Sequence, residues 1–397
     1  MVTATRLAAD IDEILPGVIA DRRWLHEHPE LSFQEVETAK FVAQRLEALG
    51  VEDIRKGVGG NGVTGLIRGG KGEGKVLMVR ADMDALAILE ETDVEFASKN
   101  PGVMHACGHD AHTAMLLGVT RVLLDRRDEF AGTVKVLFQP AEEMHPGGAI
   151  GMIKDGALED PHVDAALGLH VQSGTEAGLI GIRPDLGSAN SDRFKITIQG
   201  KGGHASRPDA AVDPVVIGAH IVTAFQTLVS RETDPLQPAV VSTTVLQAGE
   251  AFNVIPDTAE LRGTVRTFDQ DVREHIATRL PEIAEGIAAA MGGSAQATYM
   301  RGYPSIQNDP AMVENVRAAA IEAVGEENVF EPPVGMGGED FAYFSLEVPS
   351  CFFYVGVGNE ERGIVWGHHH PKFDIDEEGM AAGLATMTGA ILRYLNS

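Results

Sequence analysis

The pattern of apolar and polar positions in the first third of the chain alternates between helical and strand spacing. Apolar residues recur about every 3.6 positions over 5–28 and 33–49, which predicts two amphipathic helices, the second ending at Gly50. The short segment 63–68 lies between glycine-rich stretches and is expected to form a hairpin strand at a sheet edge, whereas the apolar run 75–80 is typical of a buried strand. Further elements are expected at 110–124 (helix) and 133–139 (strand). This alternation indicates a layered α/β domain.

The segment 192–300 has a pattern of its own. Its predicted elements run strand, helix, strand, strand, helix, strand over 194–199, 211–229, 240–247, 259–267, 271–291 and 295–300. This β-α-β-β-α-β order is that of a ferredoxin-like fold. The α/β alternation then resumes with a helix at 309–325, a strand at 350–356 and a closing helix from Glu377. We therefore expect an α+β domain at 188–300, inserted into an α/β domain made of 1–187 and 301–397.

Composition fits this division and narrows the class of protein. A chain of 397 residues is too long for one ordinary core, and its 44% hydrophobic and 23% charged residues are typical of a globular protein. With 58 acidic and 32 basic residues the net charge is −26, which argues against nucleic-acid partners and anionic membrane surfaces.

Cysteine content and the start of the chain indicate the compartment. Cys107 and Cys351 are too few for a disulfide scaffold. Asp10 comes too early for an apolar signal-peptide core, and no uncharged run approaches the ~18 residues of a membrane span. We therefore expect a soluble, cytoplasmic protein.

The densest chemistry lies in the segment 105–112, whose sequence is HACGHDAH. Cys107 and His109 stand two residues apart, and thiolate and imidazole both suit zinc and similar ions. Two other interpretations stay open at this point. The segment could be a polar turn with a buried cysteine and histidines that cap the next helix, or Cys107 could be a nucleophile paired with a histidine.

Glu142 and Glu143 follow an apolar strand directly. Adjacent side chains point in different directions, so one carboxylate could bind a metal while the other acts as a general base. Glu-Glu pairs are common on solvated helices, but the preceding Pro-Ala and the following glycine pair make such a helix a poor fit. The pair favours a metal hydrolase over a cysteine nucleophile, because a metal-activated water still needs a proton acceptor.

Two more histidine positions occur near predicted strand ends, at His170 and at 368–370. Each alone is commonly structural, yet strand ends converge in α/β folds, and the separate segments together offer five donors. Five donors exceed the usual three of one catalytic zinc and fit two metals better. Asp82 and Asp84, after the strand 75–80, either orient ligand imidazoles or are satisfied within a turn.

The inserted segment carries three polar candidates. His204 lies in the glycine-rich segment 200–206, whose glycine spacing matches no nucleotide-binding fingerprint. Asn253 and Arg266 add an amide and a guanidinium, and an arginine can hold a carboxylate through two parallel hydrogen bonds. Taken alone, Arg266 reads as an ordinary surface residue.

The motifs together resemble a known family. In order they are RADMDAL at 80–86, HACGHDAH at 105–112, QPAEE at 139–143, GLH at 168–170, GGHA at 202–205, GEDF at 338–341 and HHP at 369–371. This ordered set resembles the amidohydrolase branch of the aminoacylase/carboxypeptidase metallopeptidases, which includes hippurate hydrolases and plant auxin-conjugate hydrolases. The resemblance covers nearly the whole chain. It implies a mixed-sheet, zinc-peptidase-like catalytic domain interrupted by a ferredoxin-like lid and dimerisation domain.

The resemblance also implies roles for individual residues. Two divalent metal ions (zinc, manganese, cobalt or nickel) would be held by Cys107, His109, Glu143, His170 and His369. Glu142 would be the general base that takes a proton from the attacking water and passes it to the leaving amine. His204 would reach the active site of a partner in a homodimer or dimer-based oligomer, and Asn253 and Arg266 would hold the carboxylate of the substrate.

The expected substrate is an N-acyl amino acid, including N-acetyl and hippurate-like conjugates, cleaved at its amide bond. A carboxypeptidase or dipeptidase on the same scaffold is the alternative. A catalytically silent binding protein is a third, which the presence of Glu142 and all five candidate ligands opposes. The sequence departs from the family pattern at Ala87, in place of a proline, and at 206–209 beside His204. The run 368–370 also leaves the last ligand ambiguous by one position, and His369 is chosen for its His-x-Pro context.

Overall fold

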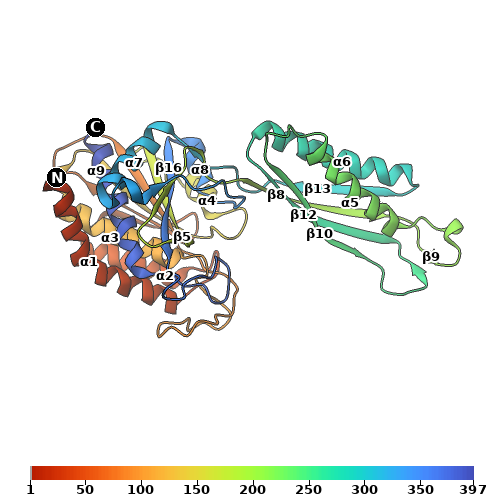
Figure 1. Ribbon diagram of the computed structural model, residues 1–397, viewed down its shortest axis with the longest axis horizontal. Helices are drawn as coiled ribbons and strands as arrows, with labels where there is room; N and C mark the ends of the chain where they lie inside the picture. The colour runs from red at the N-terminus through yellow and green to blue at the C-terminus, as the bar shows by residue number, and fades with distance from the viewer. Residues whose placement is uncertain (1) are drawn as a thin grey trace. The chain divides into compact units, whose positions relative to one another are not determined.

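The computed structural model describes residues 2–397 (Figure 1), and the chain divides into two compact units. Unit 1 consists of Met1–Gly187, Ile306–Val334 and Asp340–Ser397, and unit 2 of Ser188–Ser305 and Gly335–Glu339. No helix among residues 2–397 is long and apolar enough to cross a membrane.

Unit 1 is built on one mixed sheet of eight strands in the order β1-β2-β4-β3-β5-β16-β6-β15. The strands are β1 (Glu52–Val58), β2 (Gly62–Arg68), β3 (Val76–Asp82), β4 (Thr133–Gln139), β5 (Ala165–Glu176), β6 (Ile180–Ile182), β15 (Val329–Phe330) and β16 (Ser350–Gly358). The central strands β4, β3, β5 and β16 are parallel, and β1 and β2 form an antiparallel hairpin. The mixed α/β class is confirmed. The expectation that 63–68 forms the sheet edge is wrong, because β2 pairs with β4 as well as with β1.

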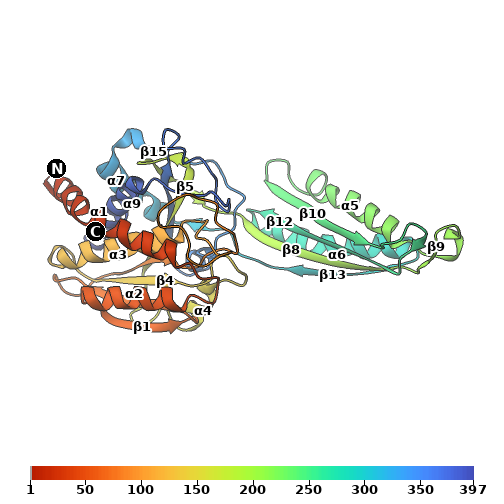
Figure 2. The same cartoon turned by 90° about the horizontal axis from the view of Figure 1, so that it is seen from below.

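Helices cover both faces of this sheet. They are α1 (Val2–Glu27), α2 (Val36–Leu49), α3 (His109–Asp125), α4 (Gly148–Lys154), α7 (Pro310–Val324), α8 (Ala342–Glu347) and α9 (Met380–Leu395). Helices α1, α3 and α9 pack together against one face, as Figures 1 and 2 show. Successive residues of β3 serve opposite faces: Leu77 and Val79 join this larger core, whereas Met78 packs in a second core with α4 and α8. Burial on both sides explains the continuous apolar runs of the central strands.

Unit 2 has one antiparallel sheet of four strands in the order β10-β12-β8-β13. Its strands are β8 (Asn190–Gln199), β10 (Ala239–Ala248), β12 (Thr258–Thr267) and β13 (Ser294–Met300), and its helices are α5 (Pro214–Ser230) and α6 (Gln270–Ala290). The chain order is the predicted β-α-β-β-α-β, and both helices pack on one face (Figure 1). Alternate residues of β8, such as Ile196 and Ile198, lie on this face and are buried. A small separate sheet joins β9 (Gly203–His204) to β11 (Val254–Ile255).

The two ends of unit 2 are held together. Ser305 donates from its backbone N–H to Oδ1 of Asn190 at 2.9 Å and from its hydroxyl to the carbonyl of Ser188 at 2.5 Å. Nearby, the buried Asp192 carboxylate accepts from the Arg273 guanidinium at 2.6 and 2.8 Å and from the Tyr299 hydroxyl at 2.8 Å. The two ends of the segment 188–305 therefore lie together, near the buried ion pair of Asp192 and Arg273. Two further short strands, β7 (Asp185–Leu186) and β14 (Gln307–Asn308), pair with each other in unit 1.

Candidate metal centre

The candidate ligands of unit 1 come from segments at or near the carboxyl ends of its parallel strands. Strand β3 ends at Asp82, β4 is followed by Glu142 and Glu143, and β5 carries His170. Helix α3 starts at His109. In open α/β sheets the crevice at these strand ends is the usual place for a site, and the structure brings these segments together. The expectation that a strand ends near His170 is wrong, because β5 continues to Glu176.

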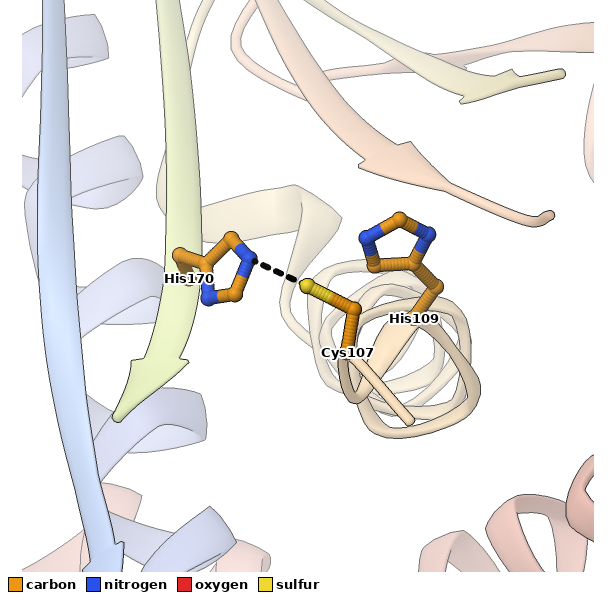
Figure 3. A group of neighbouring side chains, drawn as sticks. All are labelled: Cys107, His109 and His170. Carbon is orange, nitrogen blue, oxygen red and sulfur yellow. Dashed lines mark hydrogen bonds between the residues drawn. The ribbon is translucent and has the colours of Figure 1, made fainter. Parts of the chain in front are cut away.

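Cys107, His109 and His170 form the first donor group, with one possible ligand atom from each within 4.8 Å of the others (Figure 3). Sγ of Cys107 lies 3.4 Å from Nε2 of His170. Gly108 makes the turn between the first two with φ +88°, and a Cβ there would lie 2.4 Å from Cγ2 of Val171. Only glycine fits this close approach. Burial, and then the Glu143 carboxylate, raise the pKa of the Cys107 thiol well above its ordinary value.

Cys107 also belongs to a second group, with Glu143 and His369. Nε2 of His369 lies 3.1 Å from Oε1 of Glu143, and the backbone N–H of His369 donates to the carbonyl of Ala106 at 2.7 Å. Its backbone has φ +64°, a conformation uncommon for a residue with a side chain. Two overlapping groups of donors thus share one thiol.

The neighbours of His369 point elsewhere. The His368 ring packs against His170, with 5.1 Å between ring centroids, and burial lowers its pKa to about 4. The His370 ring stacks on Trp366 at 4.2 Å. Of the three consecutive histidines, His369 is the one that the structure places against the Glu143 carboxylate.

His109 is fully buried, and its two ring nitrogens have different surroundings. Nδ1 donates to the carbonyl oxygen of Asp84 at 2.9 Å. Within the described residues Nε2 has no hydrogen-bond partner, although it lies 3.7 Å from Oδ2 of Asp82 and 4.0 Å from Oε1 of Glu143. Burial alone would lower the pKa of His109, but the Asp82 and Asp84 carboxylates raise it to about 10. Buried ring nitrogens normally have a hydrogen-bond partner. A buried Nε2 that faces carboxylates without such a partner is therefore typical of a nitrogen that binds a metal.

Glu142 stands beside these groups. Oxygen atoms of Glu142 and Glu143 and a ring nitrogen of His109 lie within 4.8 Å of one another, and Glu142 is buried. The backbone N–H groups of Glu142 and Glu143 donate to the two oxygens of Asp84 at 2.9 and 3.0 Å. Asp84 therefore holds the backbone of both glutamates through its carboxylate, while its carbonyl accepts from Nδ1 of His109.

Asp82 belongs to a buried network of polar side chains next to the candidate metal ligands. Arg80 donates to Asp82 at 2.7 Å, to Oε1 of Gln139 at 2.9 Å and to Asp340 at 2.9 Å. Burial would raise the pKa of Asp82, but Arg80, with His109 and His112, holds it well below the ordinary value. The carboxylate therefore stays ionised beside His109.

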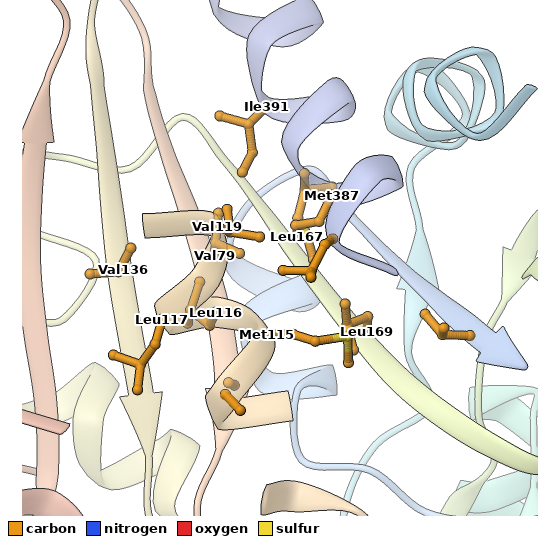
Figure 4. Packing of buried hydrophobic residues seen from close by; sticks show 14 of the residues in the cluster. Val79, Met115, Leu116, Leu117, Val119, Val136, Leu167, Leu169, Met387 and Ile391 are labelled. Atoms are coloured by element: carbon orange, nitrogen blue, oxygen red, sulfur yellow. The ribbon is translucent and has the colours of Figure 1, made fainter. Parts of the chain in front are cut away.

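The strand that carries His170 is anchored by the larger core. Figure 4 shows Leu167 and Leu169 of β5 among side chains of α3 and α9, with Met115 and Met387 next to them. All four side chains are buried. Close packing of this kind fixes the backbone of the strand and with it the direction of its histidine.

The three candidates of unit 2 are not gathered in one place. His204 is exposed on β9, pairs with Val254 on β11 and accepts from the backbone N–H of Ser206 at Nδ1, at 3.1 Å. Asn253 is exposed next to it and accepts from Ala205 at 3.0 Å through its carbonyl.

Arg266 lies at the opposite end of β12, where it pairs with Ser191. Arg266 lies eight positions after Thr258, the first residue of β12. At a rise of ~3.3 Å per residue, the two residues are about 26 Å apart along the strand. Arg266 is half-buried and donates to the carbonyls of Val265 at 3.0 Å and Asp192 at 3.4 Å. Within one copy of the chain, His204 and Asn253 are therefore remote from Arg266.

Sequence reasoning missed two residues that contact the site, Ser32 and Glu35. The Ser32 hydroxyl donates to Oδ2 of Asp84 at 2.6 Å, and Glu35 accepts from the backbone N–H of Ala141 at 2.8 Å. Both lie in the loop between α1 and α2, about fifty positions or more away in the chain. A serine and a glutamate just before a helix read as ordinary capping residues, so the local sequence holds no signal of this contact.

Comparison with known proteins decides the family. A family model described as "Peptidase family M20/M25/M40" matches residues 78–393. The chain belongs to this family. The resemblance seen in the motifs is confirmed, and the protein is a hydrolase of amide bonds.

Individual relatives cover most of the chain. An N-acyl-L-amino acid amidohydrolase of Geobacillus stearothermophilus is 47% identical over 75% of this chain and 80% of its own. Thermostable carboxypeptidase 1 of Saccharolobus solfataricus is 40% identical over 98% of both chains. The crystal structure of a Bacillus subtilis protein described as a dinuclear metal-binding peptidase of the M20 family superposes with a TM-score of 0.83 at 37% identity, covering 97% of this chain and 99% of that one.

Proposed function

We propose that the protein is a two-metal amidohydrolase that removes the acyl group from N-acyl amino acids. The observation that carries this proposal is the pair of overlapping donor groups that share Cys107. The amidohydrolase relative at 47% identity supports the substrate class. The carboxypeptidase relative at 40% identity fits the alternative, a carboxypeptidase or dipeptidase, whose substrates differ from N-acyl amino acids in the acyl group.

Five residues would hold the metal ions: Cys107, His109, Glu143, His170 and His369. Thiolate and imidazole donors favour zinc, cobalt or nickel over magnesium. Two such ions, when bound, supply Lewis-acid polarisation of the scissile carbonyl and ease ionisation of the attacking water. Within residues 2–397, Nε2 of His109 is buried and has no hydrogen-bond partner, which supports this assignment on grounds independent of the relatives.

Glu142 is the proposed general base. Its carboxylate would take the proton of the attacking water and deliver it to the amide nitrogen of the leaving amino acid. Two features support this role: the side chain is buried within 4.8 Å of His109 and Glu143, and Asp84 fixes its backbone. A Glu142→Gln variant should bind two metals per chain and lose turnover by about 10²–10⁴-fold. Full activity in that variant would reject Glu142 as the base.

Unit 2 is proposed to act across a homodimer. Nδ1 of His204 accepts from Ser206, so in the neutral ring Nε2 carries the hydrogen and can donate to the developing oxyanion. His204 and Asn253 of one copy would reach the site of the other, where Arg266 of that other copy would hold the substrate carboxylate. The distance between the two ends of β12 supports the assignment of His204 and Asn253 to one copy and of Arg266 to the other.

Mixing two inactive variants tests the homodimer. If His204 acts across the dimer, mixed dimers of His204→Ala and Glu142→Gln contain one intact site, which gives about a quarter of wild-type activity after random reassociation. No recovery, with mixed dimers shown to form, would reject action across the dimer.

The metal content per chain, measured beside hydrolysis of N-acyl amino acids and dipeptides before and after chelation, tests the function as a whole. About two metals per chain, with preference for N-acyl amino acids and activity lost to the chelator, is the expected result. Preference for dipeptides would favour the alternative, and no turnover after metal is restored would favour a silent binding protein. Activity that survives chelation and is lost on thiol alkylation would make Cys107 a nucleophile. A cytoplasmic location stays a prediction.

A further inference from the structure

Three successive backbone N–H groups in the segment that carries Glu142 are each held by a buried carboxylate. The N–H of Ala141 donates to Oε1 of Glu35 at 2.8 Å. The next two, of Glu142 and Glu143, donate to Asp84 at 2.9 and 3.0 Å. The direction of this turn is therefore set by two acceptors from separate parts of the chain.

Ala141 is the strained residue of this turn. Its φ is +53°, in the left-handed region that residues with a Cβ seldom adopt, and it is fully buried. Water cannot replace a lost acceptor at a position without solvent access. The hydrogen bond that Ala141 donates to Glu35 therefore holds this residue, directly before Glu142, in a conformation that it would otherwise tend to leave.

Glu35 is itself rigidly placed. It is fully buried, its Oε1 also accepts from the backbone N–H of Phe33 at 2.8 Å, and its Oε2 accepts from Nδ2 of Asn61 at 3.1 Å. From the same loop, the carbonyl of Glu30 accepts from the N–H of Ala85 at 2.8 Å. The loop 30–35 is thus fastened to the site segment and provides a fixed support for the 141–143 turn.

We propose that Glu35 is a positioning residue for Glu142, which it orients through the backbone N–H of Ala141. This proposal rests on the proposed role of Glu142 as general base. Among the described residues, the Glu35 side chain makes no hydrogen bond or ion pair with the candidate ligands, so its removal should affect proton transfer and leave metal binding intact. A misdirected base lowers the rate of the chemical step more than it changes substrate binding.

The chain offers a matched control in Glu30, in the same loop. Its carboxylate also accepts from backbone N–H groups, of Thr38 at 2.8 Å and Glu37 at 3.2 Å, and from the Thr38 hydroxyl at 2.9 Å. These bonds cap the start of α2, and none of them goes to 141–143 within the described residues. Glu30→Ala therefore removes a comparable carboxylate without touching the proposed support.

The test compares the variants as full-length, metal-loaded proteins on one N-acetyl amino acid. Glu35→Ala should lower kcat by about 10–100-fold with little change in KM. It should keep two metals per chain and, with cobalt bound, the visible absorption of wild type. Glu35→Gln keeps an oxygen that can accept from Ala141 and should recover kcat to within about 3-fold. Glu30→Ala should lower the melting temperature and leave kcat unchanged.

A double-variant comparison separates positioning from general damage. In a Glu142→Gln background, Glu35→Ala should add less than about 2-fold to the loss, because the group that it positions is already disabled. If the two losses multiply, or if Glu30→Ala lowers kcat as much as Glu35→Ala, the proposal is wrong. Should Glu35→Ala fail to fold, Glu35→Asp takes its place, since the shorter side chain withdraws its oxygens from Ala141.

The outcomes also distinguish this proposal from the proposed function. A wild-type protein without hydrolase turnover rejects both. An active wild type with an inactive Glu142→Gln variant and a fully active Glu35→Ala variant rejects the positioning role alone.

Discussion

The His112 imidazole joins Asp82 to the strand that carries His170. Its Nδ1 donates to Oδ1 of Asp82 at 2.6 Å, and its Nε2 accepts from the backbone N–H of Val171 at 2.9 Å. An amide can only donate, so the tautomer is fixed with the hydrogen on Nδ1. With both nitrogens engaged, His112 has no lone pair left for a metal and instead ties the two sides of the site together.

We therefore expect His112→Ala to weaken metal binding without removing a ligand. Loss of an outer partner of a metal site typically costs about 10–100-fold in affinity. Competition with a chelator should show this reduction, while excess metal should restore most of the activity. Unchanged affinity would mean that the link between Asp82 and Val171 does not order the ligands.

Cys107→Ser should have a larger effect on metal content. A serine hydroxyl does not ionise near neutral pH, so both overlapping donor groups lose their shared thiolate. We expect the metal affinity to fall by more than the roughly 10–100-fold of an outer-partner change. The control is Cys351→Ser, since Cys351 is also a buried free cysteine of unit 1 but lies outside the donor groups. Equal metal loss in both variants would contradict the assignment.

How far the sequence predicts the site depends on where each residue comes from. Cys107, His109 and Glu143 lie near a helix start or a strand end, so the hydrophobic pattern brings their segments to one edge of the sheet, whereas His170 lies inside β5, which continues to Glu176. The pattern does not specify contacts that depend on side-chain reach and tautomer. The two bonds of His112 and the reach of Glu35 to Ala141 are of this kind.

Separation along a strand is the other limit of sequence reasoning. Asn253 and Arg266 are close in the chain, and the sequence groups them as one substrate-binding pair. In the fold, residues 254–257 and most of β12 come between them. The predicted β-α-β-β-α-β order is thus confirmed. The distance between Asn253 and Arg266, in contrast, follows from the strand register, which the sequence pattern does not specify.

Stability of unit 2 should depend on the Asp192–Arg273 pair. Asp192→Asn leaves a buried guanidinium without its counter-charge, and we expect the free energy of unfolding to fall by about 3 kcal/mol at neutral pH. Burial opposes ionisation of Asp192, but the hydrogen bonds from Arg273 and the N–H of Gly302 hold its pKa below the ordinary value of 3.8.

The sign of the pH dependence of this pair follows from that shift. The stabilisation by Asp192 is complete above the ordinary pKa and is lost as the pH falls through the lower pKa of the folded state. Urea unfolding of both proteins at a series of acidic pH values should show the gap between them narrowing from about pH 4 downward. A constant gap would contradict the role assigned to the charge of Asp192.

Lys135 provides a test in unit 1. Its ammonium donates to three carbonyls of one turn, of Ala157 at 3.0 Å, Glu159 at 2.7 Å and Pro161 at 2.9 Å. Lys135→Met leaves these acceptors without the donor and should lower the free energy of unfolding by about 1–3 kcal/mol at pH 7.

Burial lowers the pKa of Lys135 to about 8, so the unfolded chain binds more protons than the folded one above that pH. Wild type should therefore gain stability relative to Lys135→Met as the pH rises from 8 toward 10, measured by urea unfolding across this range. A difference that shrinks over the same range would reject the inferred shift.

The bonds between Ser305 and the Ser188–Asn190 segment have a consequence for how such a chain can evolve. When the two ends of an insertion already lie together, the insertion does not force the segments before and after it apart. Because the entropy of closing a loop changes slowly with its length, the intervening part can be lengthened, shortened or exchanged with little cost to the host. The same freedom does not extend to Gly335–Glu339, a second segment of unit 2. Insertions and deletions within 188–305 can therefore be tolerated by unit 1 wherever they spare the residues with proposed roles in the reaction, His204, Asn253 and Arg266.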